Sequence, residues 1–254
     1  MAHQQPARLP GLFVTGTDTG VGKTVVASAI ARALTRDGRR VGVLKPVATG
    51  VIDGVCEDAE ALIDSVGGEI PRERVTPIVF EAPLAPPVAA RQAGTRLEWG
   101  DLLDSVGFAL DWWSARAEVM VVEGVGGWLC PLAEGNKTVA DLAIALDYPL
   151  VIVARGGLGT LNHTLLTVEA ARWRGLRIAG VVLNDPEPTA DSEARATNPA
   201  ELARRLEGVS VLGLLRHGDD AATTLGGTDW HGWAHSPRME IDPSRSSRPE
   251  APGA

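Results

Sequence analysis

A glycine-rich run that ends in lysine and threonine is the first feature of the sequence that could do chemistry. It reads Gly16-Thr17-Asp18-Thr19-Gly20-Val21-Gly22-Lys23-Thr24 and separates a short apolar run from a helical pattern. Glycines let backbone N–H groups approach phosphate oxygens closely, at a helix N-terminus that already favours anions. We expect residues 18–24 to bind ATP, with Lys23 on the β- and γ-phosphates and Thr24 on Mg²⁺. The alternative is a tight turn whose glycines serve only the backbone.

The spacing of this run departs from the usual phosphate loop. A glycine normally stands five positions before Gly22, but that position is Thr17 here, and Gly16 lies one residue further back. A related class of ATPases, the partitioning-type switch proteins, carries a second lysine five residues before the loop lysine. That position is Asp18 in this chain, so this class loses support.

A second lysine, Lys45, stands where a short apolar run ends, in Lys45-Pro46-Val47-Ala48-Thr49-Gly50. A lysine at the buried end of a parallel strand needs an anion or a carboxylate nearby. An ordinary ion pair would satisfy it. We favour a second cation that faces the phosphoryl group under attack.

Two carboxylates are candidate metal ligands. Glu123-Gly124-Val125-Gly126-Gly127 follows the apolar run Val119–Val122, so Glu123 occupies the position of a Walker B acid, and its glycines leave room for substrate backbone contacts. Oxygen ligands suit Mg²⁺. The alternative is a solvated acid in a glycine-rich turn. Asp58 begins a helical pattern, for which a capping or first-turn carboxylate is a sufficient reason, and Glu57 beside it leaves the choice of ligand open.

A second glycine-rich loop follows the apolar run Leu150–Ala154. It reads Gly156-Gly157-Leu158-Gly159-Thr160-Leu161-Asn162-His163-Thr164, with Asn162 predicted as the helix cap. The N–H groups at such a helix start bind a carboxylate. We favour a structural role for His163 over a catalytic base. Asn184 ends a later apolar run, where its amide suits an adenine edge or, alternatively, a turn.

The elements that must position these residues alternate between apolar runs and helical patterns, which predicts an α/β fold with a doubly wound, mostly parallel sheet and helices on both faces. Such sheets bind ligands at the C-terminal ends of their strands. The expected strands are Leu12–Thr15, Val41–Leu44, Val119–Val122, Leu150–Ala154, Ile178–Leu183 and Val209–Leu212. The expected helices are Lys23–Arg36, Asp58–Val66, Leu102–Ala115, Val139–Ala145, His163–Arg174 and Pro199–Leu206.

The chain organisation follows from the same patterns. We expect one domain over residues 1–217, a mobile loop over Asp185–Asn198, and a divergent, largely disordered C-terminal tail over residues 218–254. Gly38 and Gly175 stand where helices should end.

Composition limits the class of protein. The chain has 254 residues, 44% of them apolar, and a net charge of −8, which argues against a general nucleic-acid or anionic-membrane binder. Cys56 and Cys130 cannot build a disulfide framework and fit no zinc pattern. There is no signal-peptide pattern and no apolar run of membrane-spanning length, so we expect a cytoplasmic protein.

Four motifs in order, GTDTGVGKT, KPVATG, EGVGG and GTLNH, resemble the dethiobiotin synthetase family of P-loop enzymes from about Phe13 to Leu215. The resemblance implies that 7,8-diaminopelargonate, CO₂ or bicarbonate, and ATP with Mg²⁺ give dethiobiotin, ADP and phosphate. The steps are a carbamate, a carbamic-phosphoric anhydride and ring closure. Lys23, Lys45 and Mg²⁺ would supply positive charge, and Thr19 and Thr49 hydrogen bonds. The implied metal ligands are Thr24, Asp58 and Glu123.

The resemblance also implies a homodimer in which the GTLNH loop reaches the neighbouring site. The loop residues that would hold the substrate carboxylate are Gly159, Thr160, Leu161 and Asn162. Further substrate contacts would come from Thr49, Gly124, Gly126 and Gly127. Asn184 would contact adenine. Two positions depart from the family: Pro87 replaces a usual His, and Leu214-Leu215 replaces a common Ile-Pro pair.

Three alternatives remain. An amide-forming P-loop ligase with a glutaminase domain would need a longer chain. A regulatory or partitioning ATPase lacks support because of Asp18. A degenerate relative could bind nucleotide without ligase activity, although Lys23, Thr24, Lys45 and Glu123 are all retained.

Overall fold

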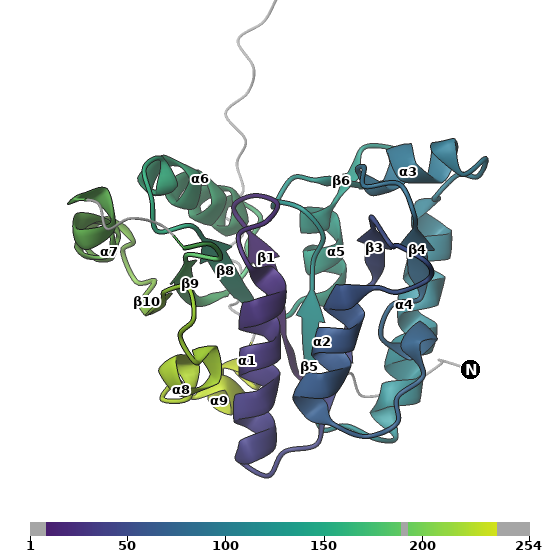
Figure 1. Ribbon diagram of the computed structural model, residues 1–254, viewed down its shortest axis with the longest axis horizontal. Helices are drawn as coiled ribbons and strands as arrows, with labels where there is room; N and C mark the ends of the chain where they lie inside the picture. The colour runs from purple at the N-terminus through teal and green to yellow at the C-terminus, as the bar shows by residue number, and fades with distance from the viewer. Residues whose placement is uncertain (1–8, 189–192, 238–254) are drawn as a thin grey trace, which may run out of the picture.

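Six parallel strands form the central sheet of the computed structural model, which describes residues 9–188 and 193–237. Their order is β10-β9-β8-β1-β5-β2, so the strand that leads into the phosphate loop lies in the middle (Figure 1). The strands are β1 (Gly11–Gly16), β2 (Val41–Leu44), β5 (Val119–Glu123), β8 (Leu150–Ala154), β9 (Ile178–Asn184) and β10 (Val211–Leu215). The predicted α/β fold with a parallel sheet is confirmed.

Burial explains why these strands read as continuous apolar runs. Every residue of β1, β5, β8 and β9 is buried, as expected for strands with both faces covered. In the register of the sheet, Val14 stands beside Glu123 and Thr15 beside Ile152. The C-terminal ends of β1, β5 and β8 therefore meet at one edge, where the glycine-rich loops begin.

Helices cover both faces of the sheet, with α1 and α2 side by side on the near face in Figure 1 and α5 behind it. The predicted helices are all present, with ends shifted by a few residues. Their bounds are α1 (Lys23–Arg36), α2 (Glu57–Val66), α4 (Trp99–Ser114), α5 (Val139–Leu146), α6 (Thr160–Trp173) and α7 (Glu193–Arg205).

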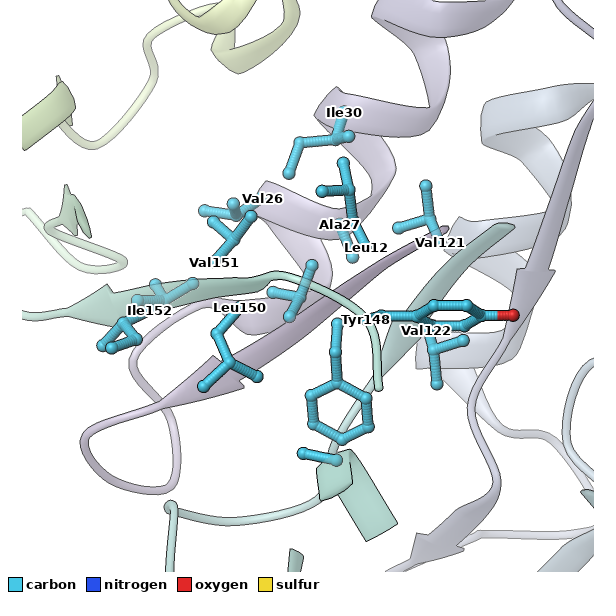
Figure 2. Packing of buried hydrophobic residues seen from close by; sticks show 14 of the residues in the cluster. Leu12, Val26, Ala27, Ile30, Val121, Val122, Tyr148, Leu150, Val151 and Ile152 are labelled. Carbon is cyan, nitrogen blue, oxygen red and sulfur yellow. The ribbon is translucent and has the colours of Figure 1, made fainter. Parts of the chain in front are cut away.

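The core fixes the start of α1 over the end of β1. Leu12 on β1 and Val26, Ala27 and Ile30 on α1 are fully buried and belong to one cluster with the neighbouring strands (Figure 2). Full burial of a side chain as large as leucine or isoleucine contributes about 1.5–3 kcal/mol. This packing therefore holds the loop between the two elements in place.

Several short elements were not predicted. They are β3 (Val47–Thr49), β4 (Ile78–Phe80), β6 (Pro131–Ala133), β7 (Lys137–Thr138), the 3₁₀ turn η1 (Arg72–Arg74) and α3 (Pro86–Gln92). β3 pairs with β4, and β6 with β7, as two small sheets. These strands and the 3₁₀ turn have only two or three residues, and α3 is shorter than two full helical turns, so no hydrophobic pattern could indicate them.

The prediction of a mobile loop over Asp185–Asn198 is wrong from Glu193 onward, because α7 begins there and contains Pro199. The first turns of α7 are held by tertiary contacts: Arg195 pairs with Asp185, and Asn198 donates to the loop after β8. Residues 189–192 of the expected loop lie outside the described residues.

The expected disordered tail also differs over its first part. Residues 218–237 contain α8 (Ala221–Leu225) and α9 (Trp230–Ala234), both of which contact α1. Trp230 is buried, and its indole N–H donates to the Leu225 carbonyl at 2.9 Å. Burial of the Trp230 ring explains why this part of the expected tail is folded. Residues 238–254 of that tail lie outside the described residues. No helix in the described part of the chain is both long and apolar enough to cross a membrane.

Candidate active site

The predicted phosphate loop joins β1 to α1, and two of its glycines have left-handed backbone conformations. Gly22 caps α1 with a φ of 89°, and Gly20 has a φ of 68°. Both values are left-handed and favour glycine. Lys23 is buried, and its Nζ donates to the Asp18 carbonyl at 3.2 Å across the loop. Burial lowers the pKa of Lys23, and the charge of Glu123 opposes that effect.

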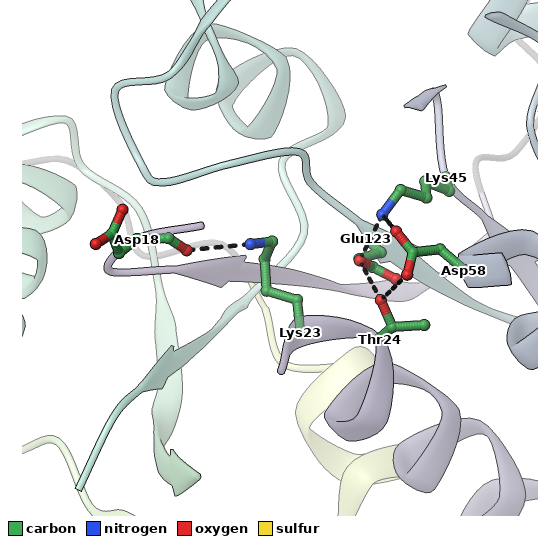
Figure 3. A network of polar contacts seen from close by, with 6 residues as sticks. All are labelled: Asp18, Lys23, Thr24, Lys45, Asp58 and Glu123. Carbon is green, nitrogen blue, oxygen red and sulfur yellow. Dashed lines mark hydrogen bonds and ion pairs between the residues drawn. The ribbon is translucent and has the colours of Figure 1, made fainter. Parts of the chain in front are cut away.

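Four further predicted residues meet beside this loop in one contact network (Figure 3). Thr24 Oγ1 lies 2.7 Å from Asp58 Oδ1 and 2.9 Å from Glu123 Oε1. Lys45 Nζ donates to Glu123 Oε1 at 2.8 Å and also forms a short ion pair with Asp58. The residues come from the first turns of α1 and α2, the end of β5 and the position after β2.

The network brings one lysine against two carboxylates in a largely buried place. Burial alone would lower the pKa of Lys45, but Glu123 and Asp58 outweigh it and raise that pKa above its usual range. Burial would raise the pKa of Asp58, but Lys45 and Thr24 outweigh it and lower that pKa. Burial raises the pKa of Glu123, with Lys45 acting against it. Lys45 is therefore a cation at neutral pH.

The oxygen atoms of this network fit Mg²⁺. A threonine hydroxyl and two carboxylates converge at the start of α1, and hard oxygen donors suit this ion. Glu123 Oε2 is buried without a hydrogen-bond partner among the described residues. A cation bound here would satisfy the unpaired oxygen.

The glycines after Glu123 pack against the phosphate loop. A Cβ at Gly127 would lie 3.4 Å from the Asp18 Cα, which is an ordinary van der Waals contact, whereas one at Gly126 would lie 2.6 Å from Cys130 Sγ. The Cys130 side chain and a φ of 62° are therefore the reasons for glycine at position 126. A Cβ at Gly124 would instead meet core side chains.

Thr49 lies apart from the network. It ends β3 and is half-buried, and no hydrogen bond among the described residues joins its side chain to Lys45, Asp58 or Glu123. Its predicted contacts with substrate and phosphate stay a prediction.

The helix after β8 begins earlier than predicted. Gly159, with a φ of 92°, is the cap of α6, whereas Asn162 is an exposed residue of its first turn. The expectation that Asn162 caps the helix is wrong, because a left-handed glycine ends the loop instead. The backbone amides of Thr160, Leu161 and Asn162 consequently form the first turn of α6.

Asn184 has a contact that the sequence did not indicate. It is buried, and its Nδ2 donates to the carbonyl of Val21 at 2.8 Å. A Cβ at Gly22 would lie 2.0 Å from this amide nitrogen. Asn184 thus packs directly against the phosphate loop. The contact joins residues 163 positions apart in the chain, so no local signal could have predicted it.

A cavity of about 390 Å³ opens next to the phosphate loop, bounded by Thr17 and Asp18 on one side and by α6 on the other. Two residues close to the phosphate loop were not among the predicted site residues. Cys130 lines the cavity, and Arg155 donates to the Thr19 carbonyl at 3.3 Å. Arg155 directly follows the expected strand Leu150–Ala154, and its strand-end position was the signal that could have found it.

Comparisons with known proteins identify the family of the chain. A family model described as an AAA domain matches residues 10–222. The ATP-dependent dethiobiotin synthetase BioD of Anaeromyxobacter dehalogenans strain 2CP-C is 49% identical over 194 residues, which are 76% of this chain and 84% of that one. The enzyme of the same name from Bacillus subtilis strain 168 is 41% identical over 205 residues, 80% of this chain and 86% of that one. The chain belongs to the dethiobiotin synthetase family.

Proposed function

We propose that this chain is a dethiobiotin synthetase, which joins 7,8-diaminopelargonate and CO₂ at the expense of MgATP and releases dethiobiotin, ADP and phosphate. The observation that carries the proposal is the contact network of Lys45, Asp58, Glu123 and Thr24 beside the phosphate-loop lysine. Its residues suit phosphoryl transfer, and relatives of the same name support the substrate.

The chemistry explains why the site needs cations rather than a nucleophile. One amine attacks CO₂ and loses a proton, which gives a carbamate. A carbamate oxygen attacks the γ-phosphorus and displaces ADP. The second amine attacks the carbonyl carbon and loses a proton, and phosphate leaves as the ring closes. The last step is intramolecular, so positioning supplies much of the acceleration.

Each residue has a defined part in this scheme. Lys23 and Lys45 neutralise charge on the transferred phosphoryl group, where catalysis depends mainly on electrostatics and alignment. Thr24, Asp58 and Glu123 would hold Mg²⁺, which supplies further positive charge when bound. The loop amides of residues 18–24 bind the phosphates, and Thr19 and Thr49 would donate hydrogen bonds near the carbamate.

The subunit arrangement is part of the proposal. Exposed apolar side chains lie on α6 and the loop before it, with Leu158 96%, Trp173 76% and Leu166 57% exposed. A second copy that covers them would place residues Gly159 to Asn162 near the neighbouring site. We infer a homodimer in which this helix start holds the substrate carboxylate. A cytoplasmic location stays a prediction.

A regulatory or degenerate ATPase is the alternative. The relatives named dethiobiotin synthetase, 49% and 41% identical, disfavour it, and so does the retention of Lys23, Thr24, Lys45 and Glu123.

Product identification tests the proposal. The purified protein is incubated with MgATP, ¹³C-bicarbonate and the diamine, and the product is analysed by mass spectrometry. We expect a cyclic urea that carries one ¹³C atom and requires all three substrates. Absence of this product from active, ATP-binding protein would contradict the proposal.

A further inference from the structure

The residue after Asn184 is a buried carboxylate that the proposed mechanism does not use. Asp185 is only 6% exposed. Its Oδ1 accepts a hydrogen bond from the Gly156 backbone N–H at 3.1 Å, and its Oδ2 accepts one from Arg195 Nε at 3.0 Å. Burial of a carboxylate costs free energy unless its oxygens accept hydrogen bonds, and both oxygens of Asp185 do so.

A second side chain from α7 holds the same loop from its carbonyl side. Asn198 is buried, and its Nδ2 donates to the carbonyls of Gly156 and Gly157 at 2.8 and 3.0 Å. A Cβ at Gly156 would lie 3.0 Å from each Asp185 carboxylate oxygen, so this close approach needs glycine. Both polar groups of Gly156 are therefore held by side chains.

Two consecutive residues at the end of β9 therefore hydrogen-bond to two different loops. Asn184 donates to the phosphate loop at Val21, whereas Asp185 accepts from the loop that leads into α6. That second loop also reaches the phosphate loop through Arg155, which donates to the Thr19 carbonyl. The segment 155–159 lies between the nucleotide site and the start of α6.

We propose that Asp185 is a positioning residue for the segment 155–159, through which it sets the place of the first turn of α6. The inference rests on the proposed function, in which that turn holds the carboxylate of the diamine. Loss of the Asp185 contacts would displace the carboxylate-binding amides, whereas the phosphate loop keeps its packing on α1 and its Asn184 contact. Asp185 therefore governs binding of the diamine more than binding of ATP.

Asp185→Asn separates this role from general stability. An amide has one acceptor oxygen, so it can serve Gly156 or Arg195 but not both. We expect the KM for the diamine to rise about tenfold or more, since small misplacements of binding groups have effects of this size. The Kd for ATP, measured by titration with a fluorescent analogue, should stay within about twofold.

The matched control is Glu201→Gln, which removes a carboxylate from α7, the helix that carries Arg195. Glu201 pairs with Arg204 and Arg205 on the exposed side of α7 and contacts neither loop. It should leave both constants unchanged. Arg195→Ala should raise the diamine KM as Asp185→Asn does, and Arg195→Lys should restore part of the loss. An equal rise in the KM for the diamine and the Kd for ATP would overturn the inference, and so would an unchanged diamine KM.

A readout independent of ligase activity keeps the two proposals distinguishable. Hydrogen exchange of the segment 155–159 should be at least about tenfold faster in Asp185→Asn than in the wild type, because either outcome loosens the segment. An asparagine that keeps the Arg195 contact leaves the Gly156 N–H without its acceptor, and one that turns its oxygen to Gly156 loses the contact with Arg195 that fixes the side chain. The segment should exchange at the wild-type rate in Glu201→Gln. If the wild type makes no dethiobiotin, the proposed function fails, and unchanged exchange in Asp185→Asn would then separately overturn the positioning role.

Discussion

Lys45 and Glu123 form a 2.8 Å ion pair between the ends of the adjacent parallel strands β2 and β5, in a place where both side chains are almost completely buried. Taking two ions out of water costs several kcal/mol per ion unless they are well paired. A protein with no use for positive charge at this edge could fill the space with apolar side chains. The pair therefore fits the proposed role of Lys45 as a second cation beside the transferred phosphoryl group.

Substitution of Lys45 tests its role directly. Lys45→Gln should lower turnover by about 100- to 1000-fold, the effect of removing one group that stabilises transition-state charge. The Kd for ATP should change little, because the contacts of the phosphate loop remain. Steady-state kinetics and nucleotide titration measure the two quantities. Lys137→Gln, which removes the charge of a lysine on β7, is the control, and normal turnover of Lys45→Gln would refute the assigned role.

The pH dependence of stability should report on Asp58. The pKa of Asp58 is lowered in the folded protein, so its contribution to stability is present above the unfolded pKa of about 3.9 and is lost as the pH falls through the folded value. The difference in unfolding free energy between wild type and Asp58→Asn should shrink on acidification from pH 6 to pH 3. Denaturant titrations at several pH values measure it. A difference that grows towards low pH would contradict the ion pair with Lys45.

Gly22 is expected to be irreplaceable for two separable reasons. Gly22→Ala adds a Cβ 2.0 Å from the Asn184 amide nitrogen at a left-handed φ of 89°. Strain of about 1–3 kcal/mol at such a site should weaken ATP binding by about 10- to 100-fold. Gly38→Ala is the control, since Gly38 has a φ of 78° and open space around it. It should lower stability and leave the Kd for ATP unchanged. Equal Kd values for the two variants would refute the Asn184 contact as the cause.

The dimer proposal predicts that Leu158 is covered in solution. Leu158→Glu places a charge on a side chain that is 96% exposed in the single chain, so it should not disturb folding of the subunit. It should convert the protein to a monomer in sedimentation and abolish ligase activity. Phe108→Glu, on α4, changes another exposed apolar side chain and should leave the dimer intact. A fully active monomer, wild type or variant, would rule out a shared site.

Much of this fold could be predicted because its main signals are local. Strands buried on both faces, such as β8, read as short apolar runs, and their C-terminal ends must lie together. Lys45 and Glu123 each follow such a run, so the sequence alone places both at this edge of the sheet. Asp58 could be placed at a helix start, but its turn towards Thr24 and Lys45 depends on how α2 packs beside α1.

Other features depend on partners far away in the chain. The helix expected over Pro199–Leu206 begins six residues earlier, as α7, because Arg195 pairs with Asp185 and Asn198 donates to the loop after β8. Asn162 has the residue type of a helix cap, but the left-handed conformation available to Gly159 decided the start of α6. In both places the local preference of the residue type did not determine where the helix begins.

Phosphate release from MgATP by the purified protein, with bicarbonate and with or without 7,8-diaminopelargonate, tests the central claim most directly. The account predicts release that depends on the diamine and matches the amount of cyclic urea formed, mole for mole. Release at the same rate without the diamine, or none despite bound ATP, would contradict it.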